Sequence, residues 1–487
     1  MSRGSPDHSP ILLAHSYYLR YDAKQWRKMK PYAPLATLIA TALLRREGRP
    51  VAFFDAMLSE GVEEFRELLR AARPKVVGIL EDNFNFLTKM CTTRMREAAF
   101  EMIAAAKSAG ARVVVNGSDA IDQPSAYLHV GADAVILGES EAALLDITNQ
   151  WARDLDADLS EVPGLALQGA PGALSTVRRT PARRAIKDLD ALPLPAWDLI
   201  DVEQYRVAWA TTHGRLSWNM CTSRGCPYAC NWCAKPVFGR RYTQRSPANV
   251  AEELARLVRA VGPDHIWFAD DIFGLTPRWI ESFATEVRAR HAATPFMMQS
   301  RADLMTASAV QALADARCEE VWLGVESGSQ NVLDAMEKGT TLDDVRSATR
   351  RLKQHGIKAC WFIQLGYPGE DWEAIVKTRD LIRDEQPDDI GVSVAYPLPG
   401  TPFHERVRMD LRGKANWSDS DDLAMMFRGT YTTAFYRDIR DLLHAEVNAR
   451  LERNAGAQEV DALWSALERR EGTQRSSTPV PLKRAVG

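Results

Sequence analysis

The sequence predicts an α/β protein with two successive series of βα units and a mainly helical C-terminal segment. Between residues 11 and 155, short apolar runs rich in β-branched residues alternate with segments of helical periodicity. The same alternation returns between residues 217 and 395. Such alternation is typical of parallel sheets covered by helices. The most specific stretch, Cys226-Pro-Tyr-Ala-Cys230-Asn-Trp-Cys233, lies near the start of the second series and holds three of the seven cysteines.

The first domain, residues 1–155, is expected to be an open parallel sheet with helices on both faces. Gly48 and Gly110 act as helix stops in this pattern. Ligands of such sheets bind at the carboxyl ends of the strands. The expected strands are Ile11–Ala14, Val51–Asp55, Lys75–Leu80, Arg112–Asn116 and Ala134–Leu137, and the expected helices are Ala33–Glu47, Val62–Arg73, Thr93–Ala109 and Glu139–Leu155.

Residues 156–204 are expected to form a connector, because prolines such as Pro163, Pro193 and Pro195 exclude regular helix. Residues 205–402 hold the second βα series. Its six steps are too few to close the usual eight-fold barrel. The expected strands are Ser217–Thr222, His265–Ala269, Phe296–Arg301, Glu320–Glu326, Ala359–Leu365 and Gly391–Ala395, and the expected helices are Pro247–Val261, Pro277–His291, Ala307–Ala316, Gln330–Met336 and Trp372–Glu385.

The C-terminal part is expected to be helical over residues 403–470, with an acidic segment at Asp419–Asp422 that either covers the open barrel or begins an exposed helix. Residues 471–487 are rich in Arg, Ser and Pro and lack periodicity, so we expect them to be disordered.

Composition excludes several functional classes. With 61 Lys and Arg against 64 Asp and Glu, the net charge is -3, and no basic block of the nucleic-acid-binding kind occurs. The first ten residues lack the apolar core of a signal peptide, and no apolar run is long enough to span a membrane. Seven thinly spread cysteines suit a reducing compartment. We therefore expect a soluble cytoplasmic protein without membrane insertion and without nucleic-acid binding.

The three crowded cysteines predict a metal centre. Three thiolates on one short loop can hold three irons of a [4Fe–4S] cluster, which is normally built with four cysteine ligands, so one iron would remain open. A tetrahedral zinc site is the alternative, and it would need a fourth ligand such as Cys221. No second Cys/His pair follows at ribbon or finger spacing, which favours the cluster.

The pattern Cys-x3-Cys-x-aromatic-Cys, with Trp232 before the last cysteine, resembles the signature of the radical S-adenosylmethionine (SAM) superfamily. The resemblance implies a partial barrel of six βα units, a [4Fe–4S] cluster held by Cys226, Cys230 and Cys233, and SAM chelated by the open iron. It also implies a small-molecule substrate and an electron donor such as flavodoxin or ferredoxin, because one electron reduces the cluster and cleaves SAM.

The resemblance further assigns SAM contacts to residues at the ends of the barrel strands. Asp270 and Asp271 match the position where relatives bind the methionine amino group, whereas a helix cap is the plain alternative. Glu326-Ser327-Gly328 lies in the second most specific match, and Gly366 begins a turn that would approach the adenine. The full expected set is Asp270, Asp271, Ser300, Arg301, Glu326, Ser327, Gly366 and Tyr396.

The first domain resembles the cobalamin-binding domain that precedes many radical SAM enzymes. The matching pieces are Pro31–Leu38, Arg45–Gly48, Val51–Asp55 and Gly131–Glu141. The motif Asp-x-His-x-x-Gly, whose histidine ligates cobalt from below, occurs nowhere in the chain. Family members that lack it can still hold cobalamin, so cobalamin is an expected cofactor. The alternative is a sheet that only packs against the barrel.

The resembled group contains anaerobic magnesium-protoporphyrin IX monomethyl ester cyclases and many methyltransferases. It implies reductive cleavage of SAM followed by cobalamin-dependent methyl transfer or radical carbon–carbon bond formation. Three alternatives stay open: oxidative ring closure as in the tetrapyrrole cyclases, transfer of the 3-amino-3-carboxypropyl group of SAM to a heteroatom such as As(III), and a non-enzymatic iron–sulfur or zinc module. The ordered strand-end motifs argue against the last, because a bare metal module needs none of them.

Overall fold

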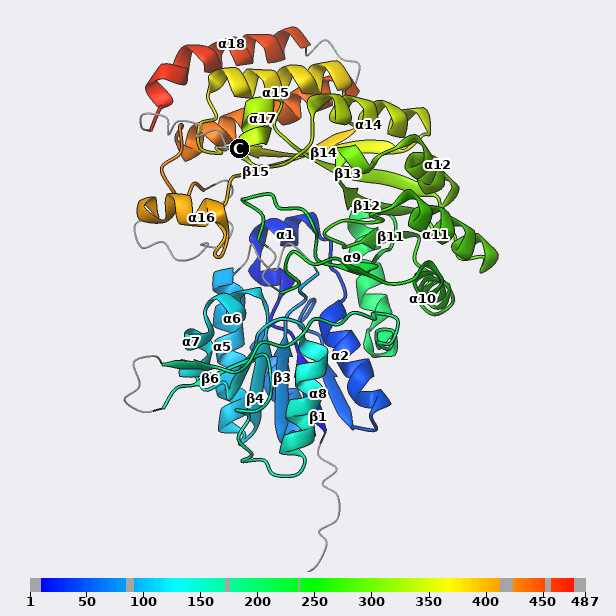
Figure 1. Ribbon diagram of the computed structural model, residues 1–487, viewed down its shortest axis with the longest axis vertical. Coiled ribbons are helices and arrows are strands. Elements are labelled where there is room, and N and C mark those ends of the chain that lie inside the picture. Colours follow the sequence, from blue (N-terminus) through cyan, green and yellow to red (C-terminus); the bar gives the residue numbers. More distant parts are fainter. Residues whose placement is uncertain are drawn as a thin grey trace, which may run out of the picture.

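The computed structural model describes residues 10–84, 92–170, 176–234, 237–411, 424–451 and 457–476. Two parallel sheets dominate this part of the chain (Figure 1). In Figure 1 the first sheet and its helices, blue to cyan, lie below the second sheet, green to yellow, and helix α18, red, lies at the top. The α/β class with a helical C-terminal segment is therefore confirmed.

The first sheet has the strand order β2-β1-β3-β4-β5-β6-β7 within the described residues. Its first five strands are parallel and match the expected ones. Helices α2 and α8 cover one face, and α3, α5 and α7 cover the other. The bounds are β1 Ile11–Ala14, α1 Ala23–Lys28, α2 Leu35–Arg46, β2 Val51–Phe54, α3 Val62–Ala72, β3 Val76–Leu80, α5 Thr92–Ser108, β4 Arg112–Asn116, α6 Ser118–Asp122, α7 Pro124–His129, β5 Ala134–Ile136 and α8 Ser140–Trp151.

The connector contains more regular structure than expected. Strands β6 (Leu165–Gln168) and β7 (Val177–Arg179) extend the first sheet as an antiparallel hairpin. Leu165 and Leu167 are buried against the sheet core, and this burial stabilises β6. Helix α9 (Val202–His213) follows and is capped by Asp201. The first sheet thus continues past residue 155, and the expectation of an irregular connector is wrong for these segments.

The second sheet has the order β15-β14-β13-β12-β11-β8 among the described residues, with every neighbouring pair parallel. It is the expected open, six-stranded partial barrel. One helix, α14 (Leu342–Gln354), was not expected; a capping box of Thr341 and Asp344 begins it. The bounds are β8 Ser217–Met220, α10 Pro247–Ala260, β11 His265–Phe268, α11 Pro277–Ala289, β12 Phe296–Ser300, α12 Ala307–Asp315, β13 Cys318–Glu326, α13 Gln330–Ala335, β14 Lys358–Leu365, α15 Trp372–Glu385 and β15 Asp389–Val394.

The C-terminal part consists of α16 (Pro402–Val407), α17 (Thr433–Leu451) and α18 (Ala457–Gln474). Tyr431 donates a hydrogen bond of 2.5 Å to Glu471, which fastens α18 to the residues before α17. The expectation of disorder from residue 471 is therefore wrong up to Gln474, which ends α18. The acidic segment 419–422 and residues 477–487 lie outside the described residues. Within the described residues, no helix is long and apolar enough to cross a membrane.

The carboxyl ends of the first sheet face the barrel. The Asn219 side chain on β8 accepts a hydrogen bond from Ala33 N and donates one to Ala33 O, both at 2.8 Å. Tyr205 on α9 donates to Asp55 Oδ2, directly after β2, at 2.8 Å. These buried contacts place the ligand-binding edge that is typical of an open α/β sheet against the start of the barrel.

Candidate active site at the ends of the barrel strands

The cysteine loop leaves the barrel between two short strands, β9 (Ser223–Arg224) and β10 (Thr243–Gln244). Gly225 turns the chain with a φ of +74°, and a Cβ atom at this position would lie 2.1 Å from Arg241 O. Only glycine fits such a position without moving the backbone. Cys226 follows and is partly exposed, as is Cys233, whereas Cys230 is buried.

Asn231 fastens the loop to two other parts of the barrel and to helix α16 of the C-terminal part. It is fully buried, and every polar atom of the residue is used. Its N donates to the carbonyl oxygen of Met336, the residue that follows α13, and its Nδ2 donates to that of Ala335, the last residue of α13. Its Oδ1 accepts from Tyr367 Oη at 2.8 Å, and its O accepts from Phe403 N at 3.0 Å. Sequence reasoning missed Asn231, because the spacing pattern marks only the cysteines around it.

The donor set of the loop fits an iron–sulfur cluster. The cysteines in the described residues form no disulfide with one another, and three of them lie on this one loop at the carboxyl ends of the strands. Within the same residues, no group of three or more His, Cys, Asp and Glu side chains is already arranged around a common point that could hold a metal ion. The fit therefore rests on the thiol chemistry and the loop position.

Arg301 lies over the cysteine loop. Its guanidinium is 3.8 Å from the centre of the Tyr228 ring, and its Nη1 is 4.0 Å from Cys230 Sγ. The same group donates to Lys338 O at 2.8 Å and to Asp303. These contacts place a permanent positive charge beside a cysteine that would be a thiolate in a cluster. The prediction that Arg301 and its neighbour Ser300 contact SAM stays untested, although Ser300 Oγ is buried without a hydrogen-bond partner in the described structure.

Glu326 ends β13 with a left-handed backbone (φ +67°), which is rare for a non-glycine residue and occurs where surrounding structure imposes it. Its carboxylate lies 2.7 Å from Lys338 Nζ, and both side chains are buried. A Cβ atom on Gly324 would lie 2.6 Å from that ammonium, so the glycine leaves room for the pair. Burial lowers the pKa of Lys338, but the charges of Glu326 and Cys230 outweigh this and raise it overall. Lys338 was missed, since a lysine in a loop carries no sequence signal.

The neighbouring residues Asp270 and Asp271 have different environments in the structure. The Asp270 carboxylate is buried and accepts hydrogen bonds from Thr222 N and Oγ1 and from Ser223 Oγ. Burial raises the pKa of Asp270 to about 6. Asp271 is exposed. Asp270 thus supports the base of the cysteine loop, and the SAM contact expected of this pair stays a prediction.

The remaining expected SAM residues occupy the ends of β13, β14 and β15. Ser327 Oγ accepts from Ser329 N at 3.1 Å. Gly366 has a φ of +77° and donates to Glu370 Oε2 at 2.5 Å. Burial raises the pKa of Glu370 to about 8, so this carboxyl group keeps its proton at neutral pH. Tyr396 is partly buried against the barrel core.

The described contacts link Cys230, Arg301 and Glu326 through Lys338, whereas they do not join Gly366 or Tyr396 to that group.

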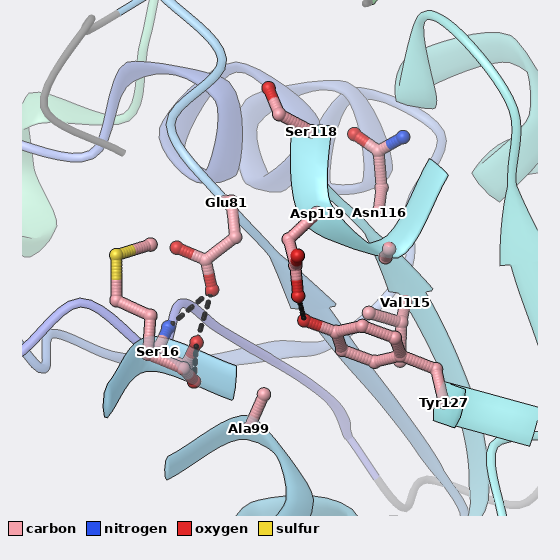
Figure 2. Close-up of a pocket in the computed structure, with 10 residues that line it drawn as sticks. Ser16, Glu81, Ala99, Val115, Asn116, Ser118, Asp119 and Tyr127 are labelled. Carbon is pink, nitrogen blue, oxygen red and sulfur yellow. Dashed lines mark hydrogen bonds between the residues drawn. The ribbon is translucent and has the colours of Figure 1, made fainter. Parts of the chain in front are cut away.

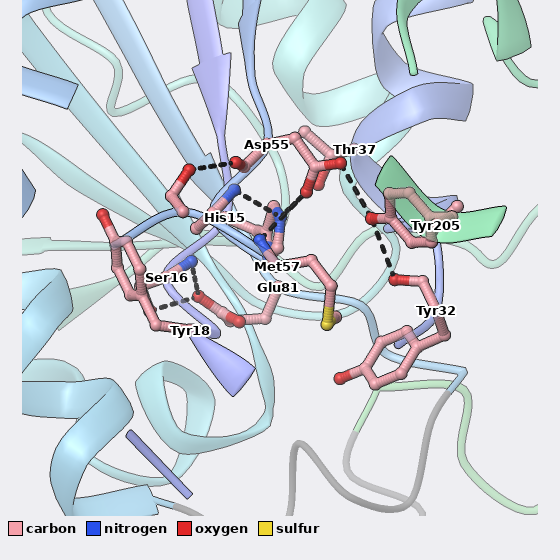
Figure 3. Close-up of polar contacts among 12 residues, drawn as sticks. His15, Ser16, Tyr18, Tyr32, Thr37, Asp55, Met57, Glu81 and Tyr205 are labelled. Atoms are coloured by element: carbon pink, nitrogen blue, oxygen red, sulfur yellow. Dashed lines mark hydrogen bonds and ion pairs between the residues drawn. The ribbon is translucent and has the colours of Figure 1, made fainter. Parts of the chain in front are cut away.

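The carboxyl edge of the first sheet carries a second polar cluster (Figure 3). His15 Nε2, after β1, lies 3.0 Å from Asp55 Oδ1, and Ser16 N and Oγ donate to Glu81 Oε1 after β3. Burial raises the pKa of Glu81. Sequence reasoning marked this edge as a whole as the ligand-binding edge and assigned no role to these side chains.

A small pocket adjoins that cluster (Figure 2). Its polar lining includes Ser16, Glu81, Asn116, Ser118 and Asp119. Glu81 Oε2 and Ser118 Oγ are buried without a partner in the described part of the chain. The volume is about 10 Å³, which is room for about one water molecule. A larger ligand at this edge would therefore lie above the pocket.

Comparison with known proteins identifies the barrel. Residues 220–382 match the family model described as the radical SAM superfamily. The chain contains a radical SAM domain. Because the domain implies a [4Fe–4S] cluster and SAM, the chain is an enzyme of that chemistry, as the cysteine spacing predicted.

Three similar proteins extend the comparison. An uncharacterized methyltransferase of Pyrococcus horikoshii is 25% identical over 391 residues, which cover 79% of this chain and 81% of that protein. The anaerobic magnesium-protoporphyrin IX monomethyl ester cyclase of Cereibacter sphaeroides is 26% identical over 57% of this chain, but the match spans only 45% of the cyclase. The solved structure of the radical SAM methyltransferase TsrM from Kitasatospora setae, with cobalamin and a [4Fe–4S] cluster bound, has a TM-score of 0.67 and 21% identity and covers 85% of this chain and 80% of TsrM. The match with TsrM shows that the two domains of this chain share the fold of TsrM.

Proposed function

We propose that this radical SAM enzyme is cobalamin-dependent and transfers a methyl group, or forms a carbon–carbon bond, at an unactivated carbon of a small molecule. One observation carries the proposal: the cysteine loop and the carboxyl edge of the first sheet meet at one interface. Arg224, two residues before Cys226, forms buried ion pairs with Glu139 and Glu141 of the first domain. Two cofactors bound at these two edges would face a shared space.

Cys226, Cys230 and Cys233 would hold the cluster, which supplies the electron that cleaves SAM. Lys338 and Glu326 form a buried pair of opposite charges near Cys230, and the methionine end of SAM carries a carboxylate and an ammonium. Exchange of partners between these two pairs would bind SAM with charge-assisted hydrogen bonds. Protonated Glu370 holds the Gly366 turn, where the glycine would let the backbone approach the adenine.

The edge of the first sheet fits an uncharged, amide-rich group such as the rim of a corrin. The unpartnered atoms there, Glu81 Oε2 and Ser118 Oγ, can accept or donate hydrogen bonds to amides. Removing a partner from buried polar groups is costly, so such atoms favour a ligand or water. The relatives that are named methyltransferases and the cobalamin present in TsrM support this assignment.

Oxidative ring closure of a tetrapyrrole is the second candidate, because several similar proteins are cyclases. The two reactions differ in product, since only methyl transfer adds a carbon to the substrate. For either reaction, we propose a flavodoxin or ferredoxin as the electron donor and the cytoplasm as the location, consistent with described cysteines that are not joined in disulfides.

The test is anaerobic turnover of SAM by the iron-loaded protein, with and without added cobalamin. We expect 5′-deoxyadenosine or S-adenosylhomocysteine to form in the presence of a low-potential reductant. The triple variant C226A/C230A/C233A should lose iron and all SAM cleavage while the first domain stays folded. Release of methylthioadenosine would instead favour 3-amino-3-carboxypropyl transfer. A triple variant with full iron content would overturn the cluster assignment.

A further inference from the structure

The side chain that precedes the cysteine loop is fixed by the first domain. Arg224 Nη1 lies 2.7 Å from Glu139 Oε1, and Arg224 Nη2 lies 2.5 Å from Glu141 Oε1. All three side chains are less than a tenth exposed. Both glutamates stand at the start of α8, where the helix dipole favours negative charge. The barrel thus inserts one cation between two carboxylates of the first domain.

Aromatic rings and the connector complete the contact. The Arg224 guanidinium lies 5.5 Å from the ring centre of Phe84, after β3, and 5.4 Å from that of Phe238, after the cysteine loop. The ring centres of Phe84 and Phe238 lie 5.1 Å apart, so the two rings are in contact. Glu139 Oε2 also accepts a hydrogen bond of 2.6 Å from Ile186 N. Arg224 therefore joins the first domain, the connector and the cysteine loop at one point.

A displacement of the Arg224 backbone must also move Cys226, two residues further along the chain. The only residue between them, Gly225, is packed against backbone carbonyl oxygens of residues 239 and 241. Arg224 itself pairs with Thr243 of β10, so a displacement of Arg224 also disturbs the β9–β10 pairing beside the cysteine loop. A planar guanidinium fixes its partners in direction as well as in distance, which a lysine ammonium does not.

We propose that Arg224 is a positioning residue that holds the cysteine loop in register with the carboxyl edge of the first sheet. It thereby sets the separation between the cluster and the ligand of that edge, which is cobalamin if the proposed function holds. Another buried ion pair near the same loop, Arg245 with Glu253, stays within the barrel. Arg245 donates to Cys221 O at 2.9 Å and has no described hydrogen bond or ion pair with the first domain. It provides a matched control.

The test uses the full-length, iron-loaded protein and the variants Arg224→Lys, Glu141→Gln and Arg245→Lys. Hydrogen exchange is measured for residues 225–233 and for the first turn of α8. Both Arg224→Lys and Glu141→Gln should accelerate exchange in the two segments together, with iron content retained. Arg245→Lys should leave the first turn of α8 unchanged. Unchanged exchange in both segments of Arg224→Lys, or an equal response of α8 to Arg245→Lys, would overturn the proposal.

A second measurement addresses the separation itself. Pulsed electron paramagnetic resonance is recorded on protein that holds the reduced cluster and cob(II)alamin. The distance distribution should shift and broaden in Arg224→Lys and keep the wild-type form in Arg245→Lys, and an unchanged distribution in Arg224→Lys contradicts the positioning role. If the wild-type protein binds no cobalamin, the proposed function fails, while hydrogen exchange still tests Arg224. Glu141→Gln keeps one of the two carboxylates and serves if Arg224→Lys does not fold.

Discussion

The buried pair of Lys338 and Glu326 gives the sharpest quantitative prediction. Replacing Lys338 with Met leaves the Glu326 carboxylate buried without its counter-ion, whose Nζ lies 2.7 Å away in the wild type. Removing one partner of a buried pair costs about 3–5 kcal/mol. For a domain of this size, 1 kcal/mol lowers Tm by roughly 2–4 °C, so the single variant should melt about 6–20 °C lower. Differential scanning calorimetry under anaerobic conditions measures the shift.

The double variant Lys338→Met/Glu326→Gln separates stability from function. It removes both charges and should recover most of the lost Tm, because neutral replacements of a buried pair are often tolerated. Although its stability recovers, the double variant should bind SAM more weakly than the wild type does. Hydrogen bonds to charged groups contribute about 1.5–3 kcal/mol, which corresponds to a Kd raised roughly 10- to 150-fold. Equilibrium dialysis with the iron-loaded protein measures Kd. A double variant that binds SAM as tightly as the wild type would refute the assignment of this pair to the methionine end.

Three further predictions follow from buried contacts. Asn231→Ala removes the hydrogen bonds that the Asn231 side chain makes with Tyr367 Oη and with Ala335 O, so iron should be lost several-fold faster to a chelator, whereas Tyr367→Phe should have a smaller effect; equal retention in all three proteins contradicts the role of Asn231. Burial raises the pKa of Glu370 from 4.5 to about 8, so the folded protein holds a proton that the unfolded chain loses, and stability should fall as pH rises from about 4.5 to 8. Glu370→Gln should flatten that slope in urea titrations, and above pH 8 its free energy of unfolding should exceed that of the wild type by up to about 5 kcal/mol; an unchanged slope would show that Glu370 is ionised when folded. Gly117→Ala places a Cβ atom 2.8 Å from Glu81 Cγ and should lower cobalamin retention on gel filtration without loss of iron; full retention would remove Glu81 from the cobalamin site.

The sequence predicted those elements whose periodicity is strong and whose ends are marked. Strand β1 and helix α15 have the expected bounds, Ile11–Ala14 and Trp372–Glu385. Strands β6 and β7 were missed because they lie in residues 156–204, where prolines and glycines interrupt the βα alternation. Helix α14 carries sequence signals that the prediction did not use, namely the capping box of Thr341 and Asp344 and buried positions at helical spacing, Val345, Ala348, Thr349 and Leu352.

Some features of the candidate site could likewise be predicted from the sequence, whereas others could not. Cysteine spacing is local in the sequence, so it located the cluster loop without a structure. Contacts such as those of Arg224 with Glu141, or of Asn231 with Tyr367, join residues that are 83 and 136 positions apart. No pattern in one sequence pairs such residues. Strand-end position drew attention to Asp270, but only the structure shows its carboxylate bound to Thr222 and Ser223.

The most direct test of the account is cofactor analysis of the protein purified without oxygen from cells supplied with cobalamin. Iron, sulfide and cobalt are quantified on the same sample, together with the absorption spectrum. The account predicts about four irons and four sulfides per chain, as a [4Fe–4S] cluster requires, and near-stoichiometric cobalamin. Iron and sulfide without cobalamin would contradict the central claim, because the first domain would then only pack against the barrel.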